Sequence, residues 1–344
     1  MRILVTGGAG FIGTNFCLYI MEKRPQWNIT VLDKLTYAGR RENLEQYESS
    51  HNYTFIKGDI CDPSAVRKAM KGCSVVVNFA AESHVDRSID DPSAFVRTDV
   101  EGVRVLLEEF RADNSRSLFL QISTDEVYGS VLTGRSSESS RLDPRSPYSA
   151  SKAGGELLAM SYFTTFQVPV VVTRASNNYG PYQYPEKLIP LFVTNAFEGQ
   201  PLPVYGDGGN MRDWMYVTDH CAGLLAVLEK GQPGRVYNLG AGEERTNLQV
   251  TEAILKATGA SDSLIRHIED RPGHDRRYAL DISLAERELQ WKPEVGFLEG
   301  IGKTVSWYRE NTSWWKTIKS GEFKEYYRRM YGKRLENSER TEKQ

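Results

Sequence analysis

Two pairs of ionisable side chains near the middle of the chain have the types and spacing that acid–base chemistry needs. In the first pair, Tyr148 and Lys152 are four residues apart in a segment with a helical pattern, so their side chains share one helix face. A neighbouring ammonium favours the phenolate and lowers the pKa of a tyrosine from about 10 towards the working pH. Such a tyrosine can take the proton of an alcohol during its oxidation. Taken alone, the same spacing also fits a solvated helical pair.

The second pair, Asp125 and Glu126, follows a segment that predicts a buried strand. In a parallel sheet, the loop after such a strand lies at the edge where ligands bind. Two carboxyl groups crowded into one pocket separate in proton affinity, so one can act as acid and the other as base, although the pair titrates as a unit. From composition alone, two loop charges without a chemical role are an equally good interpretation.

A glycine-rich turn near the N-terminus predicts a dinucleotide site. The segment TGGAGFIG runs from Thr6 to Gly13, between a predicted strand and a predicted helix. Gly7 permits the tight turn, Gly10 lets the backbone approach a pyrophosphate, and Gly13 allows close packing of helix on strand. The N-terminus of the helix then donates N–H groups to the phosphates.

An acidic residue after the second strand indicates which dinucleotide binds. Asp33 lies 20 residues beyond Gly13, where a carboxylate accepts the adenosine ribose hydroxyls and repels a 2′-phosphate. NAD is therefore favoured over NADP. Lys34, with Arg40 or Arg41, is close enough in sequence to soften that repulsion.

Strands and helices alternate through the first half of the chain. This alternation is typical of a parallel sheet covered on both faces, which makes the fold α/β, Rossmann-like and doubly wound. The predicted strands are Arg2–Thr6, Ile29–Asp33, Tyr53–Lys57, Ser74–Phe79, Ser117–Ser123 and Pro169–Arg174. The predicted helices are Gly10–Arg24, Pro63–Lys71, Ser93–Arg111 and Tyr148–Phe166.

The second half of the chain has a different pattern. Pro- and Gly-rich stretches follow Asn177 and are interrupted by predicted helices at Thr218–Glu229 and Asn247–Thr258, as expected for a smaller, loop-rich substrate lobe. We expect residues 1–176 to form the dinucleotide-binding domain, and residues 177–332 to form mainly the lobe, with some segments returning to the main sheet. Residues 333–344 are charged and predict a disordered tail.

The bulk composition excludes several classes of protein. Lys and Arg number 43 against 45 Asp and Glu, so no overall basic charge points to nucleic acid or a membrane surface. The four cysteines and five histidines lack metal-ligand spacing, and reduced, scattered thiols fit a cytoplasmic protein. No stretch approaches the about 20 apolar residues of a membrane helix, and no secretory leader precedes the first strand. We expect a soluble, cytoplasmic protein without a metal.

Several motifs together resemble one enzyme family. They are TGGAGFIG, LDKLTYAG, AAESHVDRSI, STDEVYG, PYSASKA, NNYGPYQYPEKLIPLF, PLPVYGDGGNMRDW and RPGHDRRYALD, spread over nearly the whole chain. In these motifs the sequence resembles the extended short-chain dehydrogenase/reductases, and within them the 4,6-dehydratases that act on dTDP-glucose. Sugar 4-epimerases are similar in this region but usually carry small or uncharged residues at the positions of Asp125 and Glu126.

The resemblance implies three sets of site residues. The catalytic set is Thr124, Asp125, Glu126, Tyr148 and Lys152. The NAD-binding set is Gly7, Gly10, Phe11, Ile12, Gly13, Asp33, Lys34, Leu35, Thr36, Asp59, Ile60, Phe79, Ala80, Ala81, Ser83, Thr98, Tyr148, Lys152 and Asn178. The set for the nucleotide-sugar is Ser83, Thr124, Asp125, Glu126, Asn177, Lys187, Leu188, Pro203, Tyr205, Arg212, Asn247, Arg271 and His274.

The resemblance also implies a sequence of events. Tyr148 takes the proton of the C4 hydroxyl as hydride leaves C4 for NAD, with Thr124 hydrogen-bonded to the same oxygen. Glu126 then removes the C5 proton, which the new ketone has acidified, and Asp125 protonates the departing C6 hydroxyl. Hydride returns to C6, so the expected product is dTDP-4-keto-6-deoxyglucose.

Other functions stay open at this point. The chain could be a UDP-sugar 4,6-dehydratase or a 4-epimerase, because these residues do not decide which base is recognised. It could also be a non-catalytic NAD-binding protein on the same fold. The family further implies a homodimer that forms through the helices expected at 93–111 and 148–166.

Overall fold

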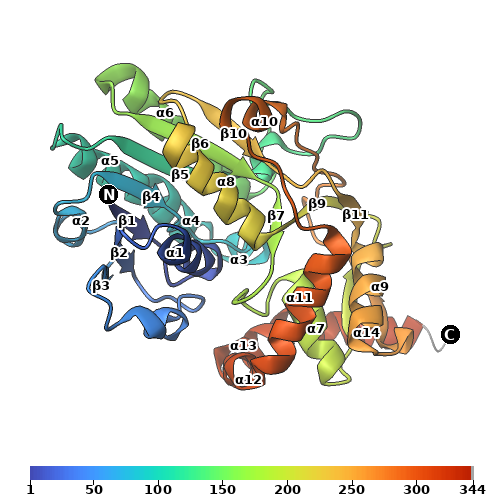
Figure 1. The fold of residues 1–344 in the computed structure, drawn as a ribbon. Coiled ribbons are helices and arrows are strands. Elements are labelled where there is room, and N and C mark those ends of the chain that lie inside the picture. The colour runs from blue at the N-terminus through green and yellow to red at the C-terminus, as the bar shows by residue number, and fades with distance from the viewer. Residues whose placement is uncertain (342–344) are drawn as a thin grey trace.

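The computed structural model describes residues 1–341 and contains a central sheet of seven parallel strands (Figure 1). The strand order is β10-β6-β5-β4-β1-β2-β3, with β1 at the point where the order reverses. The strands are β1 (Arg2–Thr6), β2 (Asn28–Asp33), β3 (Tyr53–Lys57), β4 (Val75–Asn78), β5 (Leu118–Thr124), β6 (Val170–Ala175) and β10 (Val236–Leu239). The predicted α/β doubly wound fold is confirmed.

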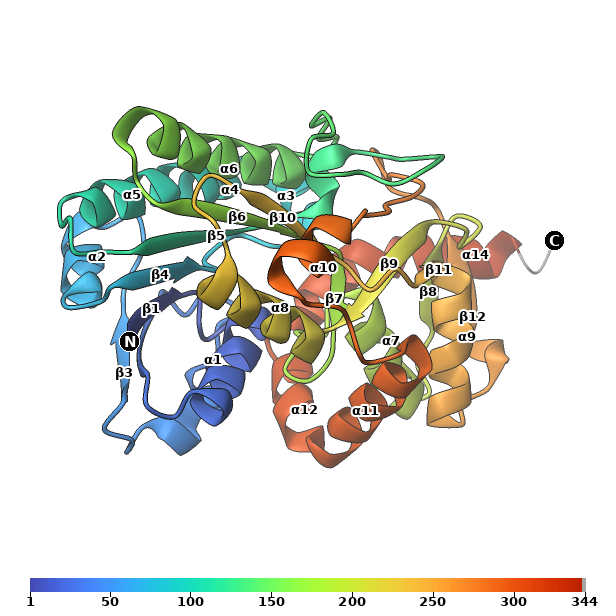
Figure 2. The same cartoon turned by 45° about the horizontal axis from the view of Figure 1, so that its top comes forward.

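Helices cover both faces of this sheet, as Figure 2 shows. On one face lie α1 (Phe11–Lys23), α8 (Val217–Lys230) and α10 (Ser283–Leu289), and on the other lie α2 (Pro63–Met70), α5 (Val103–Arg111) and α6 (Pro147–Phe166). Successive residues of a strand point to opposite faces, so Val5 packs in one core with Phe16 and Leu4 packs in the other with Leu106. All four of these side chains are fully buried.

The helix expected at 93–111 is continuous but not uniform. It consists of α4 (Pro92–Val96), the π-helical segment η2 (Arg97–Gly102) and α5. The Asp91 side chain accepts a hydrogen bond from the N–H of Ser93 (3.0 Å) and so caps its start. π-Helical turns concentrate at functional sites, and this one carries Thr98 and Asp99.

The second half of the chain forms most of a smaller lobe around an aromatic core that includes Tyr179, Tyr308 and Trp315. Its strands are β7 (Asn177–Tyr179), β9 (Met211–Tyr216) and β11 (Glu244–Thr246) in one sheet, and β8 (Leu202–Tyr205) and β12 (Ile265–Ile268) in another. Its helices are α7 (Leu188–Phe197), α9 (Asn247–Thr258), α11 (Phe297–Glu310), α12 (Thr312–Ser320) and α13 (Glu322–Tyr327). The remaining short elements are η1 (Arg41–Tyr47), α3 (Val85–Asp90), η3 (Asp125–Tyr128), η4 (Asp262–Leu264), η5 (Arg328–Gly332) and α14 (Lys333–Thr341).

The C-terminal segment differs from the disordered tail that its charge predicts. Residues 333–341 form α14, while residues 342–344 lie outside the described part of the chain. The helix is anchored because Leu335 packs against the lobe core and Arg334 donates a hydrogen bond to Tyr205.

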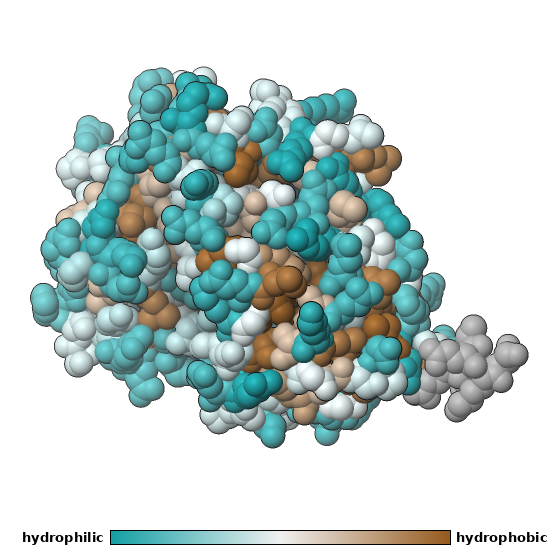
Figure 3. All heavy atoms as spheres, turned by 45° about the vertical axis from the view of Figure 1, so that its right-hand side comes forward, coloured by the Kyte–Doolittle hydropathy of each residue, from teal (hydrophilic) through white to brown (hydrophobic). Residues whose placement is uncertain are grey.

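The surface is mostly hydrophilic on the side of the molecule that Figure 3 shows, but hydrophobic side chains gather on it near the C-terminal helix. No helix within residues 1–341 is long and apolar enough to cross a membrane.

Candidate active site

The carboxyl end of β5 carries three polar residues in a row. Thr124 ends the strand, and its hydroxyl accepts a hydrogen bond from the N–H of Glu126 at 3.3 Å, which starts the turn η3. The same hydroxyl donates to Oδ1 of Asp125 at 3.1 Å, while the buried Oδ2 of Asp125 has no hydrogen-bond partner. The turn therefore brings both carboxyl groups to the crevice at the carboxyl ends of the strands.

Asp125 and Glu126 differ in the charges that surround them. Burial raises the pKa of Asp125 well above its ordinary value, and the negative charge of Glu126 raises it further. Burial also raises the pKa of Glu126, but the positive charges of Arg271 and Lys187 oppose that rise. The environment therefore favours a protonated Asp125 beside an ionised Glu126, which is one acid and one base in the same pocket.

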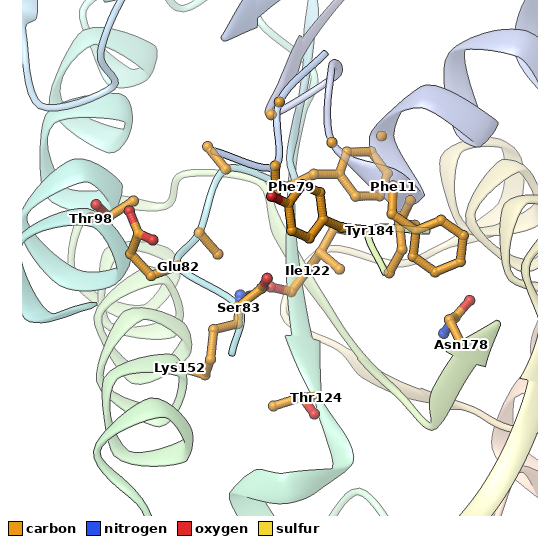
Figure 4. A pocket seen from close by; sticks show the side chains of 18 of the residues that line it. Phe11, Phe79, Glu82, Ser83, Thr98, Ile122, Thr124, Lys152, Asn178 and Tyr184 are labelled. Carbon is orange, nitrogen blue, oxygen red and sulfur yellow. Dashed lines mark hydrogen bonds between the residues drawn. The ribbon is translucent and has the colours of Figure 1, made fainter. Parts of the chain in front are cut away.

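Helix α6 carries the second pair of ionisable residues. A reciprocal cap between Ser146 and Ser149 fixes its first turn, which contains Tyr148. Lys152, one turn later, donates to the backbone carbonyl of Ile122 on β5 at 2.7 Å. Figure 4 shows Lys152 reaching from α6 towards the end of β5, where Thr124 lies. The helix is thus held against the strand that carries the carboxyl pair.

The pKa of Tyr148 is raised in this structure, which is opposite to the fall that the neighbouring Lys152 predicts. Burial raises the pKa of Tyr148 well above its ordinary value, and the negative charges of Glu126 and Asp99 add to that rise. Burial lowers the pKa of Lys152, whose ammonium bonds to a backbone carbonyl. The main opposing interaction at Tyr148 is instead a hydrogen bond with Thr124. The phenol is therefore protonated before ligands bind.

The glycine turn forms a close approach between β1 and the start of α1. Gly7 has a φ of +67°, and a Cβ there would lie 2.7 Å from the N atom of Ala80. A Cβ on Gly13 would overlap the carbonyl oxygen of Gly7. Asp33 faces the same turn, with Oδ2 accepting from the N–H of Ala9 at 2.9 Å and Oδ1 from the N–H of Leu35 at 2.8 Å. These bonds fix the carboxylate at the rim of the turn.

A cavity of about 300 Å³ extends from this turn to the carboxyl pair. Figure 4 shows Phe11, Phe79 and Tyr184 grouped in one part of it, Thr98 and Glu82 in another, and Asn178 on β7. Leu35 is absent from its lining but orients Asp33 through its N–H. The other expected NAD-binding residues all line it: Gly7, Gly10, Phe11, Ile12, Gly13, Asp33, Lys34, Thr36, Asp59, Ile60, Phe79, Ala80, Ala81, Ser83, Thr98, Tyr148, Lys152 and Asn178.

The lining of this cavity fits a dinucleotide. Asn177 Oδ1, Gln183 Oε1 and His220 Nε2 are buried there without a hydrogen-bond partner. Buried polar groups are normally paired, so a ligand with hydroxyl and amide groups is the natural partner for them. The space that Gly7 and Gly13 leave at the N-terminus of α1 suits a diphosphate.

A second cavity continues from the first. The two share Glu126, Asn177, Glu186 and Lys187, so Glu126 lies where they meet. Positive charge gathers in the second cavity, where Arg212 and Arg271 are accompanied by Lys187. The expected nucleotide-sugar residues that line it are Glu126, Asn177, Lys187, Leu188, Pro203, Tyr205, Arg212, Asn247, Arg271 and His274, while Ser83, Thr124 and Asp125 line the first.

Several cavity residues were missed at the sequence level. Glu186 is buried between the two cavities, where it accepts hydrogen bonds from Tyr37 (2.7 Å) and Arg87 (2.9 Å). His220 Nδ1 lies 3.0 Å from Oδ1 of Asn178 and orients that amide. Asp86, Tyr278 and Tyr331 also line the second cavity. Glu186, Asp86 and Tyr278 lie within the quoted motifs NNYGPYQYPEKLIPLF, AAESHVDRSI and RPGHDRRYALD, which were the available signal, whereas Tyr331 lies outside all of them.

The fold and the site together indicate the class of enzyme. A dinucleotide cleft on a doubly wound sheet, with a tyrosine and a lysine four residues apart on α6, belongs to an enzyme of the short-chain dehydrogenase/reductase type. The sequence family described as GDP-mannose 4,6 dehydratase matches residues 4–304. The chain is a member of this nucleotide-sugar dehydratase family.

Known relatives show which enzymes of this family the chain resembles. A dTDP-glucose 4,6-dehydratase of Streptomyces niveus is 50% identical over 324 residues, which cover 93% of this chain and 96% of that protein. The crystal structure of DesIV, a dTDP-glucose 4,6-dehydratase from Streptomyces venezuelae with NAD and the nucleotide TYD bound, has a TM-score of 0.90 at 48% identity, covering 92% of this chain and 100% of that one. The UDP-glucuronic acid 4-epimerase of Bacillus cereus, with UDP-glucuronic acid and NAD, has a TM-score of 0.85 at 29% identity, with coverage of 90% and 99%. The closer similarity is thus to dehydratases that act on dTDP-glucose.

Proposed function

We propose that this protein dehydrates dTDP-glucose to dTDP-4-keto-6-deoxyglucose with NAD as a cofactor that is regenerated in each cycle. The observation that carries this proposal is the position of Glu126, at the junction of the two cavities and next to Asp125, whose pKa burial raises well above its ordinary value. A 4-epimerase needs only to remove and return hydrogen at C4. A dehydratase also needs an acid and a base for elimination, and this pocket contains both.

The first step is oxidation at C4. When bound in the first cavity, NAD would supply a reversible hydride acceptor for the oxidation at C4 and the reduction at C6. Tyr148 is the base that takes the proton of the C4 hydroxyl, for which the phenol must first release its own proton to solvent, and Thr124, which shares a hydrogen bond with that phenol, holds the same oxygen. Lys152 brings positive charge to β5 through its bond to the Ile122 carbonyl. Ser151, the residue before Lys152, donates a hydrogen bond to the side chain of Asp99 at 2.6 Å.

The second step is loss of water across C5 and C6. The C4 ketone acidifies the C5–H bond, so Glu126 removes that proton as a carboxylate. Asp125 delivers a proton to the leaving C6 hydroxyl, for which its protonated state is required. Glu126 returns its proton to C5 as hydride arrives at C6, and the proton held by Tyr148 passes through solvent to replace the one that Asp125 gave up. Water leaves, and no net oxidation or reduction occurs.

The nucleotide half of the substrate fits the second cavity. Arg212 is buried and donates through Nη2 to the carbonyl of Asp275 at 2.8 Å, and its guanidinium lies 4.3 Å from the centre of the Tyr278 ring. Arg271 and Lys187 contribute further positive charge near Glu126. Guanidinium groups suit a diphosphate because they donate paired hydrogen bonds.

A homodimer in the cytoplasm is the state that we infer for the protein. Val96, Leu157 and Phe166 lie on the helices expected at a dimer interface, and they are 56%, 58% and 48% exposed in the single chain. Exposed apolar side chains on neighbouring helices are typical of an interface. All four cysteines are free thiols, as is usual in a reducing compartment. Analytical ultracentrifugation at micromolar concentration tests the dimer, and a monomer there contradicts it.

The test of the activity is turnover of purified protein with dTDP-glucose, with UDP-glucose and UDP-N-acetylglucosamine in parallel. The 4-keto product absorbs in alkali, so its formation can be followed directly. We expect product from dTDP-glucose without accumulation of NADH. Turnover of a UDP-sugar alone would keep the mechanism and change the substrate, whereas no turnover of any of the three would favour a non-catalytic NAD-binding protein.

A further inference from the structure

The C-terminal segment returns to the nucleotide cavity after the lobe is complete. Tyr331 in η5 is 4% exposed and lines the second cavity together with Tyr205 at the end of β8. The following helix, α14, lies against β12, which pairs with β8. The last described part of the chain is therefore a wall of the cavity that holds the positive charges.

Two side chains of this segment contact Tyr205 directly. Arg334 donates through Nη1 to the Tyr205 hydroxyl at 3.0 Å, and its guanidinium lies 5.4 Å from the centre of the Tyr205 ring. The ring of Tyr331 packs beside the same ring, with 6.2 Å between the ring centres, and its hydroxyl shares a hydrogen bond with the Tyr205 hydroxyl, which Tyr331→Phe removes. Tyr205 also meets His274 edge-on, at 5.9 Å between the ring centres. Its position is therefore fixed partly by the C-terminal segment.

The contacts continue from Tyr205 to a cation of the nucleotide site. The Tyr205 hydroxyl lies 3.4 Å from Oδ2 of Asp86, and Oδ1 of Asp86 accepts a hydrogen bond from Nη1 of Arg271 at 3.0 Å. Asp86 is 5% exposed and belongs to α3 in the first half of the chain. Because the Asp86 carboxylate is buried and bonded to Tyr205 through one oxygen, it holds the Arg271 guanidinium in place through the other.

We propose that Tyr331 and Arg334 are positioning residues of the nucleotide site, which hold Arg271 ready for the diphosphate through Tyr205 and Asp86. This rests on the proposed function, because it assigns Arg271 to a nucleoside diphosphate. Neither residue belongs to the motifs on which the family was recognised. They set the affinity for the nucleotide-sugar through Arg271 and make no direct contact with Thr124, Asp125, Glu126 or Tyr148.

The segment offers its own matched controls. Arg329 lies five residues before Arg334, and it pairs with Asp90 at 3.2 Å on the surface, away from the cavity lining. Tyr327 is a half-buried tyrosine of the same segment, and its hydroxyl accepts from Asn195 at 3.3 Å outside the cavity. Arg329→Ala and Tyr327→Phe therefore remove the same chemical groups from the same segment without touching Tyr205.

The experiment compares Arg334→Ala and Tyr331→Phe with these two controls in the full-length protein. Titration calorimetry with dTDP and with UDP gives the dissociation constants, and steady-state kinetics with dTDP-glucose gives KM and kcat. We expect Arg334→Ala to weaken nucleotide binding and raise KM roughly fivefold to tenfold, because one charge-assisted hydrogen bond is lost. NAD content, melting temperature and kcat should change little, and Arg334→Lys should recover part of the affinity.

Each outcome decides one question. An Arg334→Ala variant whose dTDP affinity and KM stay within about twofold of Arg329→Ala overturns the positioning role. A fall in kcat and melting temperature with no selective effect on KM overturns it too, because that is the signature of a purely structural contact. If the wild type binds dTDP but turns over no dTDP-glucose, the proposed reaction fails while the calorimetric comparison still tests Arg334. Binding of neither nucleotide by the wild type contradicts both proposals.

Discussion

Thr124 Oγ1 donates to Oδ1 of Asp125 at 3.1 Å and leaves Oδ2 of that buried carboxyl group without a partner. Burial raises the pKa of Asp125 well above its ordinary value, and the negative charge of Glu126 adds to the rise, so this carboxyl group tends to keep its proton. The free Oδ2 can then carry that proton towards the sugar. Several consequences of this arrangement can be measured.

Replacing Asp125 with asparagine should abolish dehydration and change how stability depends on pH. Because the pKa of Asp125 is raised in the folded state, the wild type loses stability as pH rises above the unfolded-state pKa of about 4. The substituted amide has no charge to gain. The melting temperature of the ligand-free Asp125→Asn variant should therefore exceed that of the wild type by more at about pH 8 than at about pH 5. If the difference in melting temperature between the variant and the wild type became smaller as pH rises, Asp125 would be ionised and stabilising.

Replacing Glu126 with glutamine should separate oxidation from elimination. Tyr148 and Thr124 remain, so C4 oxidation continues slowly, but the base for C5 is gone and turnover falls about 10²- to 10⁴-fold. Single-turnover absorbance of the reduced nicotinamide should show NADH that forms and persists. Full dehydratase turnover by this variant would remove Glu126 from the mechanism.

The decrease in rate at acid pH depends on the protonation of Glu126, the same base. Glu126 must be ionised to act, and burial raises its pKa above the ordinary range, with Arg271 and Lys187 limiting the rise. The rate kcat/KM with dTDP-glucose should therefore fall as pH decreases through this raised value. Arg271→Gln removes one opposing positive charge, so the fall should begin at higher pH. A profile that Arg271→Gln leaves unshifted would speak against Glu126 as the titrating group.

Replacing Tyr148 with phenylalanine should stop the first step. The ring fills the same space beside Phe95, whose ring centre is 6.3 Å away, so folding and NAD binding should persist. The loss of the proton acceptor should reduce C4 oxidation about 10²- to 10⁴-fold, with no NADH in a single turnover. Retained NADH formation would assign the base to another group.

Residues in contiguous motifs could be predicted from the sequence because their geometry is local. Gly7, Gly13 and Asp33 follow from one strand, one turn and the next strand, and the position of Glu126 follows from the end of β5. The sequence predicts a plain helix at 93–111, whereas the π-helical turn within it, which brings Asp99 towards Ser151, depends on packing against α6.

Other features depend on tertiary contacts that no spacing reveals. The pKa of Tyr148 rises because of burial, although its lysine neighbour predicts a fall. The link from Arg334 through Tyr205 and Asp86 to Arg271 joins positions scattered along the chain. The charge of the C-terminal segment predicts disorder, whereas the contacts of Arg334 and Leu335 keep it helical.

The internal return of hydride is the central claim, and dTDP-glucose labelled with deuterium at C4 tests it most directly. Turnover by the wild-type protein, followed by mass spectrometry and NMR of the product, locates the label. We expect a 4-keto-6-deoxy product with the deuterium in its C6 methyl group and no net NADH. A product whose methyl group lacks the label, or label that is lost to free NADH, would contradict this claim.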